Sequence, residues 1–206
     1  MRNATRSRRI TQPVAPGPVV TTLCAGKTLI RTVDGALTAD ECRALIATSE
    51  DGGFTDAPIT TPAGFVRRPD VRNNTRYMVD DHDLAARLWT RLAEYVPATI
   101  GHWQVLGLNE RFRFYRYEPG QYFRWHVDGC FRRSRCERSF LTLMLYLNGD
   151  FVGGATDFDN RALVEPLSVT PRPGCALIFT HAQLHQGAPV ARGRKYVLRT
   201  DVMYRR

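Results

Sequence analysis

The sequence lacks any apolar run of about 20 residues, the length that a membrane-spanning helix needs. Its start, MRNATRSRRI, is basic, but the apolar segment of a secretory signal does not follow it. We therefore expect a protein without a membrane partner and with a cytoplasmic location.

The cysteines lack the spacing of a disulfide framework. There are five of them, an odd number, at positions 24, 42, 130, 136 and 175. Cys130 and Cys136 flank a basic loop, but no second pair of cysteines completes a zinc site. Reduced thiols are the expected state, which agrees with a cytoplasmic location.

Acidic residues are scarce relative to basic ones. The chain has 20 Asp and Glu against 29 Lys and Arg, which gives a formal net charge of +9. Such a balance suits nucleic acid, an acidic peptide or a small anionic substrate. Two basic segments, RRPDVRNNTR at 67–76 and GCFRRSRCER at 129–138, are expected to flank the mouth of a site.

A length of 206 residues fits one domain, and the sequence has no internal repeats. Residues 1–26 are basic and rich in proline, which predicts a flexible tail ahead of a single domain at 27–206. A capping box at Thr38 and Glu41 predicts a helix over 39–50. Leucines at helical spacing predict a second helix over 81–95.

The rest of the chain favours short strands. The segment 54–80 has no clear periodicity, and we expect a long loop there. Strands are expected at 27–33, 139–148, 162–170, 175–180 and 195–204. In SFLTLMLYLN (139–148) the leucines share one face, expected to meet the helices, while Thr142, Met144 and Tyr146 share the other. This order predicts an α+β fold, with either two-layer sheets or a closed jelly roll, and the helices on one outer face.

The most informative stretch is RFRFYRYEPGQYFRWHVDG, from Arg111 to Gly129. It begins with strict alternation, passes through a turn at 118–120, and then presents His126 and Asp128 two residues apart. Residues i and i+2 of a strand point to the same side, so the two side chains would aim at one point. Two histidines and one carboxylate form the facial triad of non-haem iron oxygenases, and either His181 or His185 could supply the third ligand.

Four motifs in the second half of the chain, residues 108–204, carry a resemblance to a known family. They are Tyr117-x-Pro-Gly-Gln-Tyr-x-x-x-His126-x-Asp128, Leu143-x-x-Tyr146-Leu-Asn148, Gly153-Gly154-x-Thr156-x-Phe158 and His185-x-x-x-Pro189-Val190-x-x-Gly193-x-Lys195. In this order they resemble the Fe(II)/2-oxoglutarate-dependent dioxygenases, specifically the prolyl 4-hydroxylase-like branch. That resemblance implies a double-stranded β-helix (jelly-roll) core.

The resemblance also implies roles for individual residues. It selects His185 over His181, so that His126, Asp128 and His185 would be the metal ligands and the catalytic residues. Lys195 would bind the far carboxylate of 2-oxoglutarate, with Arg194 as the alternative. Three further side chains would contact the cosubstrate, namely Tyr117, Thr142 and Tyr146. The implied cofactors are Fe(II) and 2-oxoglutarate, with ascorbate as an optional reductant.

The implied reaction is hydroxylation of an unactivated C–H bond, coupled to decarboxylation of 2-oxoglutarate to succinate. A peptidyl proline or a small, amino-acid-like metabolite would be the substrate. Two alternatives stay open: an oxidative demethylase of alkylated nucleic acid, and a basic jelly-roll binding module without activity. The sequence assigns no partner to Arg111, Arg113 and Arg116, and it does not predict the oligomeric state.

Overall fold

A computed structural model describes residues 19–24, 28–61, 64–159 and 167–206. Antiparallel sheets and two α-helices make up this part of the chain. The main sheet has ten strands. They are β1 (Val20–Cys24), β2 (Ile30–Val33), β3 (Thr55–Asp56), β6 (Thr75–Asp80), β7 (Thr99–Ile100), β8 (Trp103–Leu108), β9 (Arg111–Tyr117), β11 (Glu137–Tyr146), β15 (Ala176–Thr180) and β18 (Lys195–Arg205).

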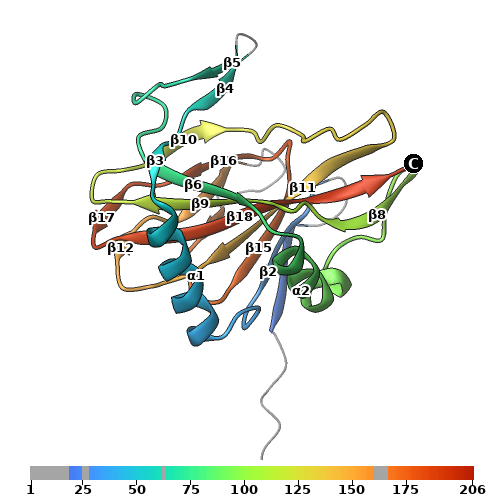
Figure 1. Ribbon diagram of the computed structural model, residues 1–206, viewed down its shortest axis with the longest axis horizontal. Helices are drawn as coiled ribbons and strands as arrows, with labels where there is room; N and C mark the ends of the chain where they lie inside the picture. The colour runs from blue at the N-terminus through green and yellow to red at the C-terminus, as the bar shows by residue number, and fades with distance from the viewer. Residues whose placement is uncertain (1–18, 25–27, 62–63, 160–166) are drawn as a thin grey trace, which may run out of the picture.

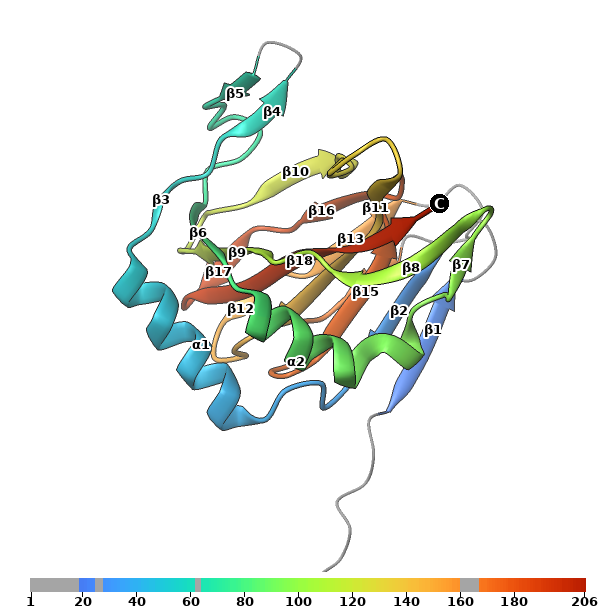
Figure 2. The same cartoon turned by 45° about the vertical axis from the view of Figure 1, so that its right-hand side comes forward.

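A smaller sheet faces the main one. Its four strands are β10 (Phe123–His126), β16 (Leu184–Gly187), β13 (Thr156–Asp159) and β14 (Leu167–Val169), in that order. Two short pairs complete the strands, β12 (Val152–Gly153) with β17 (Val190–Arg192) and β4 (Ile59–Thr61) with β5 (Gly64–Val66). Figures 1 and 2 show the helices on one side of the main sheet, β10 and β16 on the other, and the β4–β5 pair projecting outward.

Both helices begin at the caps that the sequence contains. The Thr38 side chain accepts a hydrogen bond from the Glu41 amide, and the Glu41 carboxylate accepts one from the Thr38 amide, ahead of α1 (Ala39–Gly52). The Asp81 side chain accepts a hydrogen bond from the Leu84 amide at the start of α2 (His82–Leu92), and a 3-10 turn, η1 (Ala93–Tyr95), follows that helix. Each cap satisfies amides that a helix leaves without an intrahelical partner, which confirms the predicted starts.

The main sheet separates two apolar cores. On its helix side, Leu141, Leu143 and Leu145 of β11 pack with residues of α2 such as Leu88. On its inner side, Tyr146 packs with aromatic residues of β9 and of the small sheet. The predicted division of β11 into a leucine face toward the helices and a polar face away from them is therefore confirmed.

The same division runs along β18. Tyr196, Leu198, Val202 and Tyr204 belong to the helix-side core, and Val197 belongs to the inner core. Lys195 and Arg199 share the parity of Val197, because side chains of a strand alternate between its faces. Since β18 pairs with β8, β9 and β11, it fixes the position of these inner residues against three neighbouring strands.

Two predictions about the first third of the chain were wrong. Residues 54–80 hold β3, β4, β5 and β6 rather than one long loop. The alternation in β6 is short, and only its pairing with β9 places Tyr77 and Val79 against the helix-side core. Val20–Cys24, which the sequence placed in a flexible tail, form β1 through pairing with β2. The rest of that predicted tail, 1–18 and 25–26, lies outside the described residues, as does 162–166 of the predicted strand 162–170.

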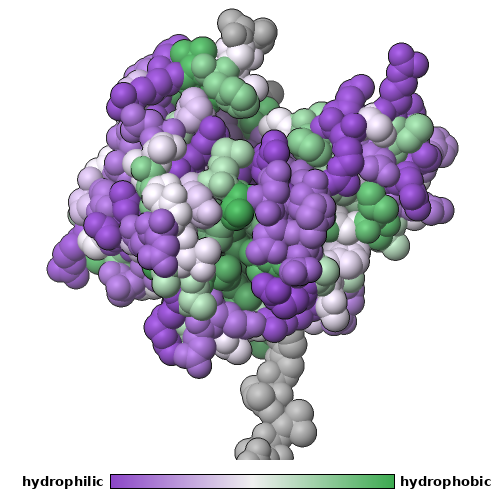
Figure 3. Space-filling view, viewed as in Figure 1, coloured by the Kyte–Doolittle hydropathy of each residue, from purple (hydrophilic) through white to green (hydrophobic). Residues whose placement is uncertain are grey.

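A groove lies between α1 and α2 on the outer face. Its lining includes Leu45, Leu84, Leu88 and Phe114. On this side of the molecule, Figure 3 shows green, hydrophobic surface between more hydrophilic surfaces. Neither helix in the described part of the chain is long and apolar enough to cross a membrane.

Candidate metal centre

Two histidines that are far apart in the sequence meet across two neighbouring strands. His126 at the end of β10 lies directly opposite His185 of β16. Asp128 follows just beyond the end of β10, and its amide donates a hydrogen bond to the His181 carbonyl at 2.9 Å. The expectation that one strand carries both His126 and Asp128 is therefore wrong, because β10 ends at His126 and Asp128 lies in the following loop. The two side chains still approach one another, as expected.

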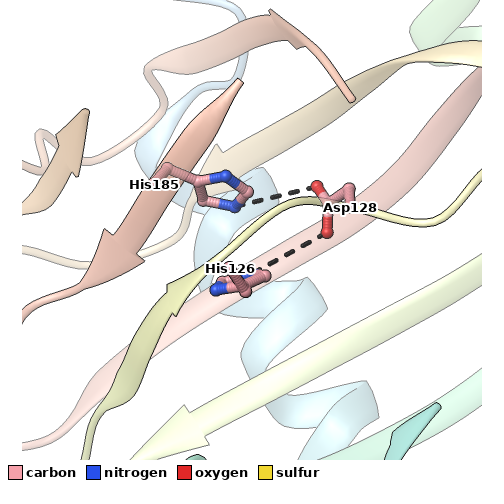
Figure 4. Close-up of side chains that lie close together, drawn as sticks. All are labelled: His126, Asp128 and His185. Carbon is pink, nitrogen blue, oxygen red and sulfur yellow. Dashed lines mark ion pairs between the residues drawn. The ribbon is translucent and has the colours of Figure 1, made fainter. Parts of the chain in front are cut away.

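The three side chains converge on one point (Figure 4). The His126 Nε2 atom lies 3.9 Å from Asp128 Oδ1, and the His185 Nε2 atom lies 3.8 Å from Asp128 Oδ2. The three candidate ligand atoms all lie within 4.8 Å of one another, so that a single ion can contact all of them. Among the described residues, these three form the cluster with the donor set of a non-haem iron site.

The outer nitrogen of each imidazole is held by the backbone. His126 Nδ1 lies 2.7 Å from the Arg124 carbonyl oxygen, and His185 Nδ1 lies 2.9 Å from that of Gln183. Since a carbonyl only accepts hydrogen bonds, each Nδ1 carries the proton and each Nε2 presents its lone pair to the centre. Metal-binding histidines show this arrangement because the outer hydrogen bond sets the tautomer and the ring orientation.

The protonation states also suit a cation. Burial, together with neighbouring His185, lowers the pKa of His126 to about 3, and burial lowers the pKa of His185 as well. Burial alone would raise the pKa of Asp128, but Arg199 and the two histidines lower it well below its usual range. Both imidazoles are therefore neutral and the carboxylate is ionised at neutral pH, which is the form that binds a metal.

A chain of hydrogen bonds supports Asp128 from behind. Thr142 Oγ1 donates to Asp128 Oδ2 at 2.5 Å and lies 3.0 Å from His181 Nδ1. His181 Nε2 lies 2.8 Å from Ser139 Oγ, which accepts a hydrogen bond from the Phe131 amide. Burial lowers the pKa of His181 to about 4, so this imidazole is neutral. His181 therefore lies behind Asp128 and is not part of the cluster.

Arg199 and Asp201 add a buried ionic pair to this support. Arg199 Nη2 lies 3.2 Å from Asp128 Oδ1 and 3.1 Å from Asp201 Oδ1. Arg113 approaches the other Asp201 oxygen at 3.2 Å. Charge-assisted hydrogen bonds of this kind hold a carboxylate in one orientation.

Lys195 occupies a second polar position on the inner face. The residue is 2 % exposed, and its ammonium group donates to the Gly154 carbonyl at 2.6 Å. The nitrogen also lies 5.3 Å from the Tyr117 ring centre and 5.5 Å from that of Tyr146. The Tyr146 hydroxyl lies 2.7 Å from Thr156 Oγ1.

The charge of Lys195 is poorly compensated. In the described part of the chain no carboxylate stands within 4.0 Å of it, and burial lowers its pKa to about 7, against a weak opposing effect of Asp157. A buried cation without a counter-ion is costly, so this position suits an anionic group of a bound molecule.

The other candidates for the cosubstrate are distributed differently. Arg194 points to the surface, where its Nε lies 2.7 Å from Glu118 Oε1. Tyr117 and Tyr146 lie beside the Lys195 ammonium group. Thr142 lies against Asp128, and its hydroxyl group is committed there rather than beside Lys195.

Several polar residues of the centre were missed by the sequence reasoning. Arg113, to which the sequence assigned no partner, pairs with Asp201, while Arg111 and Arg116 pair with Asp80 and Glu50. The parity of β18 contained the signal for Arg199 and Asp201, because both share a face with Lys195.

The sequence comparisons agree with these observations. Residues 112–200 match the family model described as the 2OG-Fe(II) oxygenase superfamily. A curated relative, the "Putative prolyl 4-hydroxylase" of Acanthamoeba polyphaga mimivirus, is 32 % identical over 106 residues. That match covers 43 % of this chain and 42 % of the relative, so the chain spans less than half of the relative's length.

Solved structures show the same fold. The viral collagen prolyl hydroxylase of Paramecium Bursaria Chlorella virus-1, in complex with 2OG, gives a TM-score of 0.60 at 22 % identity, covering 86 % of this chain and 96 % of that one. A Pseudomonas putida prolyl-4-hydroxylase gives 0.62 at 21 % identity, covering 86 % and 92 %. A prolyl hydroxylase of Trichoplax adhaerens, in complex with a hypoxia-inducible-factor peptide fragment, gives 0.64 at 15 % identity, covering 84 % and 82 %.

Proposed function

We propose that this protein, whose residues 112–200 match the family model of the 2OG-Fe(II) oxygenase superfamily, is an Fe(II)- and 2-oxoglutarate-dependent dioxygenase that hydroxylates an unactivated C–H bond. The observation that carries the proposal is the convergence of His126, Asp128 and His185, with both Nε2 atoms directed at the carboxylate. The match to this family also supports describing the two facing sheets as a jelly roll.

The donor set fits ferrous iron. Two neutral imidazoles and one carboxylate on one side leave the opposite positions open, as in the facial triad. When bound there, iron and 2-oxoglutarate supply the oxidative chemistry, in which decarboxylation to succinate accompanies hydroxylation of the substrate.

The residues of this chain hold and orient the reactants. His126, Asp128 and His185 bind the metal, while Thr142 and Arg199 keep the Asp128 carboxylate in position. Lys195 binds the far carboxylate of 2-oxoglutarate. This assignment favours Lys195 over Arg194, because Lys195 is buried without a carboxylate partner in the described residues and Arg194 is paired with Glu118.

The proposed substrate is a peptidyl proline or a small, amino-acid-like metabolite. The names of the relatives and structural neighbours support the first choice. The positive charge of the chain supports a substrate with anionic character.

The test is succinate formation from 2-oxoglutarate with and without Fe(II). Each of the variants His126→Ala, Asp128→Ala and His185→Ala is expected to lose iron-dependent turnover, because each removes one metal ligand. His102→Ala is the matched control, since that histidine is exposed and lies outside the cluster. Full activity in any of the three ligand variants would show that the assignment is wrong.

A further inference from the structure

Arg72 is a buried cation beside the metal centre, and the proposed reaction gives it no role. The residue is 6 % exposed. Its Nε donates to the Asn74 side-chain oxygen at 2.7 Å, and its guanidinium lies over the rings of Tyr115 and Phe123, at 4.3 Å and 4.4 Å from their centres. These neutral neighbours position the group without neutralising its charge.

The anion that would compensate Arg72 is absent from the described residues. No carboxylate oxygen of that part of the chain stands within 4.0 Å of it, and its buried Nη2 has no hydrogen-bond partner. The less deeply buried Arg113 and Arg199 differ, because both pair with Asp201. Burying a charge is costly unless it is paired, so the structure around Arg72 suits a negatively charged ligand.

Arg72 is close to the reacting centre. The Phe123 ring, which its guanidinium covers, also stacks on the His126 imidazole with 3.5 Å between ring centres. Backbone hydrogen bonds join the segment before and after Arg72 to β10, from the Arg124 amide to the Val71 carbonyl and from the Asn73 amide to the Tyr122 carbonyl. One aromatic ring therefore separates this cation from a metal ligand.

Tyr115 links Arg72 to Arg199. Burial alone would raise the pKa of Tyr115, but Arg72, Arg199 and Arg113 around it lower that pKa instead. The Nε of Arg199 is also buried without a hydrogen-bond partner. The surroundings of Tyr115 are therefore positively charged overall.

The far carboxylate of 2-oxoglutarate already has a position elsewhere. Lys195 is opposite Tyr117 on β9, whereas Arg72 covers Tyr115, two residues earlier on the same strand. Two residues along a strand correspond to about 7 Å. Among the cations on the inner face of β9 in the described residues, Lys195 and Arg72 thus lack a carboxylate partner and occupy separate positions, whereas Arg113 and Arg199 pair with Asp201.

We propose that Arg72 binds a carboxylate of the primary substrate, so that the substrate is an organic acid. This inference rests on the proposed function and specifies its substrate class. A carboxylate would accept the free Nη2 hydrogen bond and neutralise the guanidinium. It could belong to a free amino acid or to an acidic residue of a peptide, and the experiment separates these sources.

The test compares acids with their amides. The protein is loaded with Mn(II) and 2-oxoglutarate. It is then titrated calorimetrically with each of the proteinogenic L-amino acids and with the corresponding carboxamide. A second series uses end-blocked peptides that contain glutamate or, in its place, glutamine. We expect an acid to bind about ten- to a hundredfold more tightly than its amide, the usual worth of a hydrogen bond to a charged group. Preference for the glutamate peptide would identify a peptide carboxylate.

Variants of Arg72 test whether this residue causes the preference for acids over amides. Arg72→Met is expected to abolish the difference between acid and amide, and Arg72→Lys to retain part of it, with the KM for 2-oxoglutarate unchanged in both. Arg43→Gln is the matched control, because it removes one positive charge from an exposed position on α1. The inference is overturned if the unmodified protein shows no preference for acids, or if Arg72→Met raises the KM for 2-oxoglutarate instead.

Failure of this inference differs from failure of the proposed function. If the iron-loaded protein forms succinate but prefers no acid, only the role of Arg72 is wrong. If it forms no succinate from 2-oxoglutarate with any compound of the two series, the proposed function itself fails.

Discussion

Raising the pH above 7 should weaken the binding of 2-oxoglutarate through Lys195. Burial lowers the pKa of this side chain from 10.5 to about 7, so the ammonium loses its proton near neutrality in the free protein. A carboxylate beside it favours the charged form, and binding therefore takes up a proton at higher pH. The affinity for 2-oxoglutarate is greatest below pH 7, and it falls as the pH rises through the pKa that Lys195 has in the free protein.

The size of the effect follows from the charged fraction of Lys195. With a pKa of about 7, roughly nine tenths of the molecules carry the ammonium at about pH 6 and roughly one tenth at about pH 8. The Kd for 2-oxoglutarate should therefore rise about tenfold over these two pH units, which corresponds to about 1.4 kcal/mol. The metal ligands do not contribute to this slope, because burial keeps both histidines neutral there.

Calorimetric titration of the Mn(II)-loaded protein with 2-oxoglutarate, at several values between about pH 6 and about pH 8.5, measures the slope. Lys195→Arg is the matched control, because a guanidinium stays charged throughout this range and should give a flat profile. A flat profile in the unmodified protein, or the same slope in the arginine variant, would refute the role of Lys195 as the titrating group.

Substitutions at two neighbouring residues of β11 should affect different properties, metal affinity at Thr142 and stability at Leu143. Thr142→Val removes the hydrogen bond to Asp128 and should weaken Mn(II) binding about ten- to a hundredfold. Unaltered Mn(II) affinity in calorimetry would contradict this. Leu143→Ala empties part of the helix-side core and should lower the free energy of unfolding by about 2–5 kcal/mol. Urea denaturation measures that loss, and Mn(II) affinity should survive in the folded fraction.

Much of the fold could be predicted because its signals are local. The capping box at Thr38 and the alternation in β11 each involve a few adjacent residues, and both appear in the structure as expected. The segment 54–80 gave no such signal. Its strands are short, and β6 is recognisable only through its pairing with β9, which no local pattern reveals.

The residues of the candidate site likewise fall into those that local motifs predicted and those that only the structure revealed. Four motifs with fixed spacing identified His126, Asp128 and His185, and the structure brings these three together. The supporting contacts were hidden because they join distant strands, as where Arg113 of β9 meets Asp201 of β18. Arg72 lies in the segment predicted as a loop, so only the register of β10 against it shows that it is buried beside Phe123.

Because β18 has two faces with different roles, a substitution in this strand and an insertion into it have different consequences. A substitution at Leu198 changes the packing under the helices, and one at Lys195 changes the inner pocket, so that each property can be altered alone. Inserting one residue would turn every following side chain to the opposite face. If the insertion lies between Lys195 and Leu198, Arg199 would turn toward the apolar core, and Leu198 would take its place beside Asp128. Selection can therefore adjust stability and chemistry independently along this strand, but only while its length stays constant.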